Sequence, residues 1–301
     1  MPKEIAKTSE EPKSSLSVKP SAKSLTIPKK KTPVKKPAAK KSGNKKDQVS
    51  ILFGQALELH LQGKLKKAWS LYQEILKVQP KYFDAIHSMG LIASQMGDFA
   101  MAIKLFDQAI TIDPKNPQAH NNMANGLSGM GKRVDALAHF DTAISLEPNY
   151  AEAFNNRGIL LRSLNGIKEA IESYNKAISL NPNFAEAYFN RGNAFVETGQ
   201  LIQALQSYDS AINLNSDHAA ALNNRGVILR NLKQPDLALK NFDRAIKIRP
   251  KYADAYNNRG YTMLDLKQYA RALASFEKAL ILKSKDPSAL EGKALAKKAG
   301  K

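Results

Sequence analysis

The sequence predicts an all-α solenoid in which antiparallel helix pairs stack one on another, preceded by a disordered tail. Three observations predict this fold class. The chain repeats itself with a period of 34 residues from about residue 49, and seven copies follow without insertion or deletion. Small and aromatic residues recur at fixed places in each copy. A proline or serine closes each copy. Self-similarity with a period of roughly 20–50 residues is typical of repeat architectures.

Within a copy, numbered from 1 to 34, four positions keep their residue type. Position 8 is Gly or Ala, position 20 is alanine, position 24 is aromatic and position 32 is proline or serine. The alanines are Ala68, Ala102, Ala136, Ala170, Ala204, Ala238 and Ala272, and the aromatic residues are Tyr72, Phe106, Phe140, Tyr174, Tyr208, Phe242 and Phe276. Because proline cannot continue a helix, position 32 ends the second helix of each copy. In four copies a glycine near position 15 separates this second helix from the first helix. Helices of about 14 residues are marginal alone and must pack on their neighbours.

These boundaries divide the chain into three parts. The seven repeats are expected at 49–82, 83–116, 117–150, 151–184, 185–218, 219–252 and 253–286. Residues 287–301 are expected to form a C-terminal capping helix and a basic end, with Leu290 and Leu295 covering the last repeat while Lys293, Lys297 and Lys298 face water. Residues 1–48 are rich in Lys, Pro, Ala and Ser and hold no aromatic residue. Such a segment buries too little apolar surface to order itself, so we expect disorder there.

The period and the residue spacing resemble those of tetratricopeptide (TPR) repeats. This resemblance implies a right-handed superhelix of antiparallel helix pairs, with the first helix of each repeat (helix A) on the concave surface and the second (helix B) outside. The segments AEAFNNRGILLRSL and ALNNRGVILRNL also resemble repeats of the O-linked N-acetylglucosamine transferase family and its bacterial relatives, where an asparagine-lined superhelix grips substrate peptides. In that family the catalytic region follows the repeats, and here the chain ends fifteen residues after the seventh repeat. We therefore expect this chain not to be an enzyme by itself.

The candidate binding residues are asparagines of helix A. Positions 4, 7, 8, 11 and 14 share one side of helix A and form its packing face, while positions 2, 5, 6, 9, 12 and 13 share the other. Asparagine recurs at positions 5, 6 and 9, as Asn121, Asn122, Asn125, Asn155, Asn156, Asn190, Asn193, Asn223, Asn224, Asn257 and Asn258. Asparagine is a poor helix former, so its repetition calls for a reason. A row of amides, each donating and accepting hydrogen bonds, suits the backbone of an extended peptide. The alternative is an inert residue copied by duplication.

Position 7 is arginine in four copies, Arg157, Arg191, Arg225 and Arg259. It lies on the packing side, so we expect a buried stem and a guanidinium group that finds an acid. Asp209, Asp243 and Glu277, at position 25, are the candidate partners. This pattern favours a structural role for the arginines over a role in ligand binding.

The formal net charge is +19, of which residues 1–48 carry +10 from fourteen lysines and four acids. A lysine-only tail without aromatic residues suits non-specific contact with the phosphate backbone of nucleic acid or another anionic surface. A solubilising spacer is the equal alternative. The two can be separated by deleting residues 1–48.

Several functional classes are not indicated. Cysteine is absent, which excludes disulfides and thiolate sites. The five histidines show no metal-ligand spacing, so we expect no metal and no cofactor. No apolar run approaches the roughly 20 residues of a membrane span, and a soluble, cytoplasmic protein is expected. The leading hypothesis is a protein-protein adaptor that holds an extended peptide. The alternatives are the substrate-recognition arm of a glycosyltransferase whose catalytic chain is separate, and a nucleic-acid-associated protein anchored by its tail.

Overall fold

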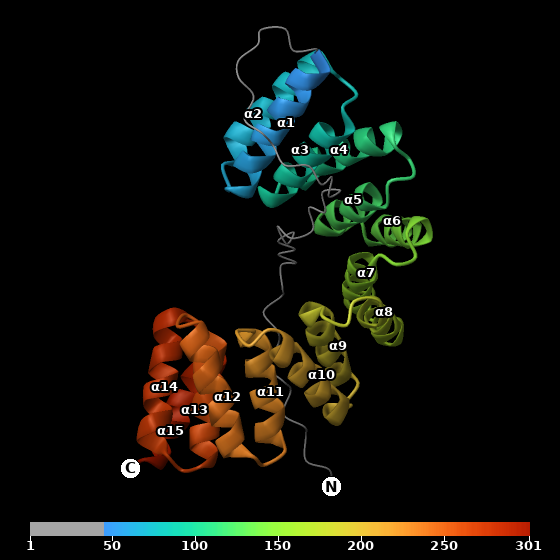
Figure 1. The fold of residues 1–301 in the computed structure, drawn as a ribbon. Coiled ribbons are helices and arrows are strands. Elements are labelled where there is room, and N and C mark those ends of the chain that lie inside the picture. The colour runs from blue at the N-terminus through green and yellow to red at the C-terminus, as the bar shows by residue number, and fades with distance from the viewer. Residues whose placement is uncertain (1–44) are drawn as a thin grey trace. The chain divides into compact units, whose positions relative to one another are not determined.

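The computed structural model describes residues 45–301, which form fifteen helices and no strand (Figure 1). The helices are α1 (Lys45–Leu61), α2 (Leu65–Val78), α3 (Phe83–Gln95), α4 (Phe99–Ile112), α5 (Pro117–Gly129), α6 (Arg133–Leu146), α7 (Ala151–Ser163), α8 (Ile167–Leu180), α9 (Ala185–Glu197), α10 (Leu201–Leu214), α11 (Ala219–Asn231), α12 (Pro235–Ile248), α13 (Ala253–Asp265), α14 (Tyr269–Leu282) and α15 (Pro287–Ala299). They form two compact units, 45–156 and 157–301, divided within α7. This confirms the predicted all-α solenoid of helix pairs with a fifteenth, terminal helix.

The first helix begins earlier than the repeat period indicates. The chain is already helical at Lys45, four residues before the expected start at 49. Asp47 lies in the first turn of α1, where a carboxylate interacts favourably with the positive end of the helix dipole. The rest of the expected disordered tail, 1–44, lies outside the described residues.

Each repeat buries the same two side chains. The alanines at position 20 are fully buried, and so are aromatic rings at position 24 such as Phe242. A Cβ atom placed on Gly226, at position 8, would lie 2.7 Å from the ring of Phe242. The ring therefore packs directly on the backbone of helix A in its own repeat. A small residue at position 8 is what allows this close approach.

The turn between helices A and B takes the same shape in all seven repeats. Position 15 has a positive φ throughout, and the backbone N–H three residues after the helix bonds the carbonyl five residues earlier, as from Gln268 to Met263 (2.8 Å). This is the Schellman ending of a helix, which favours glycine because its backbone is left-handed. Glycine occupies the site in Gly63, Gly97, Gly131 and Gly199, whereas Asn165, Lys233 and Lys267 adopt the same conformation at φ 66°, 60° and 59°.

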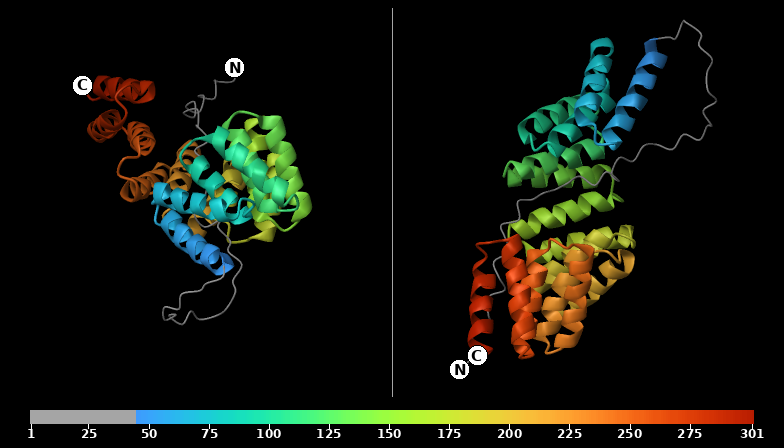
Figure 2. Two further views of the ribbon diagram at one scale, coloured as in Figure 1. Left: turned by 90° about the horizontal axis from the view of Figure 1, so that it is seen from above. Right: turned by 90° about the vertical axis from the view of Figure 1, so that its left-hand side faces the viewer.

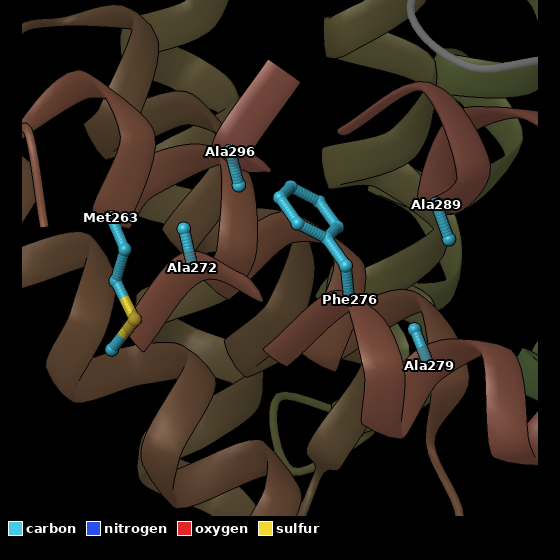
Figure 3. Close-up of a cluster of buried hydrophobic side chains, with 6 residues drawn as sticks. All are labelled: Met263, Ala272, Phe276, Ala279, Ala289 and Ala296. Carbon is cyan, nitrogen blue, oxygen red and sulfur yellow. The ribbon is translucent and has the colours of Figure 1, made fainter. Parts of the chain in front are cut away.

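The terminal helix α15 packs through small residues, which corrects the predicted cap. Ala289 and Ala296 join the buried cluster around Phe276 (Figure 3), while Leu290 and Leu295 are 50 % and 46 % exposed. The close fit on the Phe276 ring admits alanine and glycine and leaves no room for leucine. Within the C-terminal unit α12 to α15 stand side by side (Figure 2).

Two further findings concern the described residues. None of the helices between residues 45 and 301 is both long and apolar enough to cross a membrane. In the same range no three histidine or acidic side chains gather as metal ligands would.

Candidate functional site

The asparagines of helix A form two rows that differ in exposure. The inner row, at position 5, is buried: Asn121, Asn155, Asn223 and Asn257 are 4 %, 5 %, 5 % and 9 % exposed. The outer row, at position 6, is half-buried, and it comprises Asn122, Asn156, Asn190, Asn224 and Asn258. Only the outer row keeps a surface that a ligand could reach without displacing protein. The expectation that both rows line an open groove is therefore corrected for the inner row.

In the N-terminal unit the two rows form a continuous relay of hydrogen bonds. The Nδ2 atom of Asn155 donates to Oδ1 of Asn156 (3.5 Å), and Asn156 donates to Oδ1 of Asn121 (3.1 Å) in the preceding repeat. Asn121 donates to Asn122 (3.4 Å), and Asn122 donates to Nε2 of His87 (2.9 Å). Each inner-row amide thus donates to the outer-row amide of its own repeat, each outer-row amide donates to the preceding repeat, and the relay ends on a histidine.

The C-terminal unit repeats this arrangement in the same direction. Asn258 donates to Oδ1 of Asn223 (3.0 Å), which donates to Asn224 (3.2 Å), and Asn224 donates to Oδ1 of Asn193 (2.9 Å). The hydroxyl group of Tyr208 also donates to Asn193 (2.7 Å). Asn193, at position 9, is therefore the acceptor that ends this relay, just as His87 is the acceptor that ends the relay of the N-terminal unit. The fourth inner-row residue, Asn257, donates to Oγ of Ser288 in α15 (3.0 Å).

The relay leaves part of the Asn156 and Asn224 amides for another partner. A carboxamide has two N–H donors and two carbonyl lone pairs. Asn156 and Asn224 each use one donor and one lone pair within the relay. One donor and one acceptor remain at each, on side chains whose rotamers the relay already holds. Such ordering before binding lowers the entropy lost when a ligand is bound.

Two histidines take part in contacts between repeats in the neutral form. Burial lowers the pKa of His87 to about 4, so its imidazole is neutral near pH 7 and can accept the hydrogen bond of Asn122. Burial also lowers the pKa of His60, which bonds the side chain of Gln95 (3.1 Å). The electrostatics of this unit therefore favour neutral polar groups between repeats.

A second set of cross-repeat contacts joins positions 12 and 13 on the same face. Arg162 pairs with Glu197 at 2.9 Å, and Arg230 pairs with Asp265 at 2.6 Å. His60 and Gln95 occupy the same two positions in the N-terminal unit. All of these partners, like Asn156 and Asn121, are 35 residues apart. A search for complementary residues at this separation would have found them from the sequence.

Two of the four arginines at position 7 form ion pairs that the sequence suggested, whereas Arg157 donates to Ser173 and Arg191 donates to Ser207 and Asn175. Arg225 pairs with Asp209 at 2.6 Å and Arg259 with Asp243 at 2.8 Å, each acid lying in the preceding repeat. The third candidate acid, Glu277, pairs instead with Lys293 of α15 at 3.0 Å. These ion pairs connect consecutive repeats on the packing side of helix A, and they do not involve the asparagines of the outer row.

Helix pairs in tandem, with a row of asparagine side chains along the first helices of each unit, define a helical-repeat scaffold. The chain belongs to the tetratricopeptide repeat family. Residues 92–131, 158–199 and 192–233 match the family described as TPR repeat, and residues 219–252 and 241–274 match families described as tetratricopeptide repeat.

Comparison with solved structures gives the same result. YrrB, described as a TPR protein with an unusual peptide-binding site, is 27 % identical with a TM-score of 0.53, over 64 % of this chain and 100 % of that one. PilF of Pseudomonas aeruginosa is 17 % identical with a TM-score of 0.62, over 70 % and 96 %. A tetratricopeptide repeat protein of Parabacteroides merdae is 18 % identical with a TM-score of 0.61, over 83 % and 99 %. The last two show the fold alone. A comparison with curated proteins finds no match.

Proposed function

We propose that this protein is an adaptor whose outer row binds an extended segment of a partner protein. TPR proteins generally bind protein or peptide partners, and YrrB is one with a peptide-binding site. The observation that carries the proposal is the remaining donor and acceptor on each of Asn156 and Asn224, two half-buried amides held by the relay.

The chemistry of the row favours a peptide backbone over a particular side chain. An amide that keeps one donor and one acceptor can bond one N–H and one C=O of an extended chain. Because the same amide recurs from repeat to repeat, such contacts recur along the ligand. Recognition of this kind depends little on the ligand's sequence, so specificity would come from neighbouring side chains at positions 9, 12 and 13.

The other hypotheses stay as alternatives. A substrate-recognition arm of a glycosyltransferase would use the same row, and no match supports that assignment over an adaptor. A nucleic-acid role for residues 1–48 concerns a segment that lies, up to residue 44, outside the described residues. The outer-row proposal rests on neither.

The test is an affinity titration of peptides selected from a random library on the immobilised full chain. We expect Asn156→Ala alone to weaken binding by less than about tenfold, because one hydrogen bond contributes about 0.5–1.5 kcal/mol. Replacement of Asn122, Asn156, Asn190, Asn224 and Asn258 together by alanine should weaken it by at least about a hundredfold. Asn213→Ala, on the exposed side of α10, is the matched control and should leave the affinity unchanged.

The relay adds a requirement to this test. Loss of an outer-row amide also removes a partner of a buried inner-row amide, so the five-site variant should unfold at a lower temperature. Binding must therefore be measured well below the thermal midpoint of each variant. Unchanged affinity of a folded five-site variant would show that the row acts only between repeats.

A further inference from the structure

The outer faces of the last two helices B carry a concentration of basic side chains. Lys240, Arg244 and Lys247 are spaced at i, i+4 and i+7 along α12, and all three are exposed. Lys278 of α14 takes the place of Arg244 one repeat later. Lys251 and Lys285 are exposed in the turns that follow these helices. We call these six residues the basic patch.

All four positions of the patch are basic only in repeat 6, whereas repeats 1 and 2 carry two lysines each there and repeats 3 and 5 carry none. Lys247 corresponds to Ser179 of repeat 4, Lys251 and Lys285 correspond to Asn183, and Lys278 corresponds to Ser210 of repeat 5. The repeat fold therefore does not require lysine at these positions. Their positions, 22, 26, 29 and 33, also lie away from the buried positions 20 and 24 of helix B.

Three acids beside the patch are engaged in ion pairs with other basic residues, whereas Asp236, one turn before Lys240, and Asp217, next to the Ser216 carbonyl that Arg244 bonds (2.6 Å), are exposed. Asp243 of α12 pairs with Arg259, and Glu277 of α14 pairs with Lys293. Asp286, which follows Lys285, pairs with Lys283 at 2.6 Å. These three carboxylates are thus held in ion pairs with other basic residues, and the six basic side chains of the patch outnumber the two exposed acids beside them.

An apolar side chain lies within this charged surface. Ile281 of α14 is 74 % exposed, one helical turn after Lys278. It occupies position 29, where α12 has Lys247 and repeat 4 has Ser179. An exposed isoleucine adds nothing to binding a phosphate backbone. Among exposed lysines it suits a bilayer surface, where basic groups attract anionic headgroups and an apolar group enters the interface.

We propose that the basic patch and Ile281 form a docking surface for an anionic lipid bilayer. The full chain would bind reversibly through headgroup contacts of the lysines, with Ile281 entering the boundary between headgroups and acyl chains. Because the patch is on helices B, docking leaves the outer row of helices A available. The proposal is independent of peptide binding.

The test is flotation of the full chain with vesicles of phosphatidylcholine containing about 30 % phosphatidylserine, at about 0.15 M salt. The variant replaces Lys247→Ser, Lys251→Asn, Lys278→Ser and Lys285→Asn, each taken from an earlier repeat of the same chain. We expect its partition to the vesicles to fall by at least about tenfold, since each lysine near an anionic surface contributes appreciably. Pure phosphatidylcholine vesicles should bind neither protein. Partition unchanged by the four substitutions would overturn the proposal.

Two further variants separate this surface from general charge and from nucleic acid. A control that replaces Lys66, Lys67 and Lys77 by Ser and Lys81 by Asn removes the same charge from repeat 1, and it should keep partition within about twofold of the parent chain. An equal loss in this control would overturn the proposal. Ile281→Ser should lower vesicle partition severalfold and leave binding to duplex DNA unchanged. If the patch variant loses DNA binding while vesicle partition is insensitive to Ile281→Ser, the surface belongs to nucleic acid. The N-terminal segment is present in every variant, so its contribution cancels.

Discussion

The two units of the array share one packing scheme and differ in how their repeats are fastened together. In the N-terminal unit neutral groups join helices: His60 bonds Gln95, and Asn122 bonds His87. In the C-terminal unit the equivalent of the first contact is the Arg230–Asp265 ion pair. Both contacts join position 12 of one repeat to position 13 of the next, but the first is a neutral hydrogen bond and the second is an ion pair. The buried alanines and aromatic rings are therefore common to all repeats, whereas a polar contact between repeats can differ in chemistry if both of its partners change together.

A further neutral contact lies within the third repeat. The Nδ1 atoms of His120 and His139 are 3.1 Å apart, and Nε2 of His120 bonds the carbonyl oxygen of Pro114 (3.0 Å). One ring must donate and the other accept, so the pair holds together only while at least one imidazole is neutral. Burial lowers the pKa of His139, and His120 lowers it further. The histidine contacts of the N-terminal unit should therefore be sensitive to acid.

The largest expected effect tests the packing that the two units share, in which an aromatic ring lies against a glycine at position 8. Gly90→Val in the N-terminal unit and Gly226→Val in the C-terminal unit both place a branched side chain against an aromatic ring, because a Cβ would lie 2.5 Å from Phe106 or 2.7 Å from Phe242. Each should lower the free energy of unfolding of its unit by about 3 kcal/mol. Hydrogen exchange resolved by residue measures the effect in each unit. A large loss in one unit and none in the other would break the view that packing is common to both.

The second prediction tests the neutral histidine contacts, which distinguish the N-terminal unit. The pKa of His87 is lowered from 6.5 to about 4 in the folded protein, so the unfolded chain binds a proton first as the pH falls. The stabilisation from the neutral ring is complete above about pH 6.5 and is lost progressively toward pH 4. Between pH 7 and 5 the N-terminal unit should lose at least about 1 kcal/mol.

The C-terminal unit should lose less over the same interval. His218 lowers the pKa of Glu186, so that contact weakens only when the pH falls below the ordinary glutamate range near 4.5. Hydrogen exchange at pH 7 and pH 5, corrected for the intrinsic exchange rate, compares the two units directly. Equal destabilisation would contradict the contrast drawn from the histidines.

The smallest expected effect sharpens a second difference, in the turns. The three described turns of the N-terminal unit have glycine at position 15, whereas Lys267 holds the left-handed backbone at φ 59° in the C-terminal unit. Lys267→Gly should stabilise the seventh repeat by about 0.5–1 kcal/mol, because a non-glycine residue is strained there. The reverse change, Gly97→Lys, should destabilise the second repeat by a similar amount. A thermal melt of each variant measures the shift, and opposite signs are required.

Much of the fold could be predicted from the sequence because each repeat is defined by residue types at fixed positions within 34 consecutive residues. The 34-residue period and the proline-marked ends predicted the helix pairs, and the buried Ala and aromatic positions were identified from spacing alone. The Arg225–Asp209 and Arg259–Asp243 pairs were also among those predicted, since charge and position limited the choice. The peptide-binding role of the asparagines was predicted and stays a prediction.

The sequence by itself determined which residues lie on each side of a single helix. Only the tertiary structure decided how neighbouring repeats are offset. Stacking places position 6 of one repeat beside position 5 of the preceding repeat, so Asn156 meets Asn121 and the inner row is buried. A helical projection cannot show this, because the angle of a residue around its own helix does not contain the shift along the array. For the same reason the sequence predicted that Leu290 and Leu295 would cover the last repeat, whereas the fit on Phe276 selected Ala289 and Ala296.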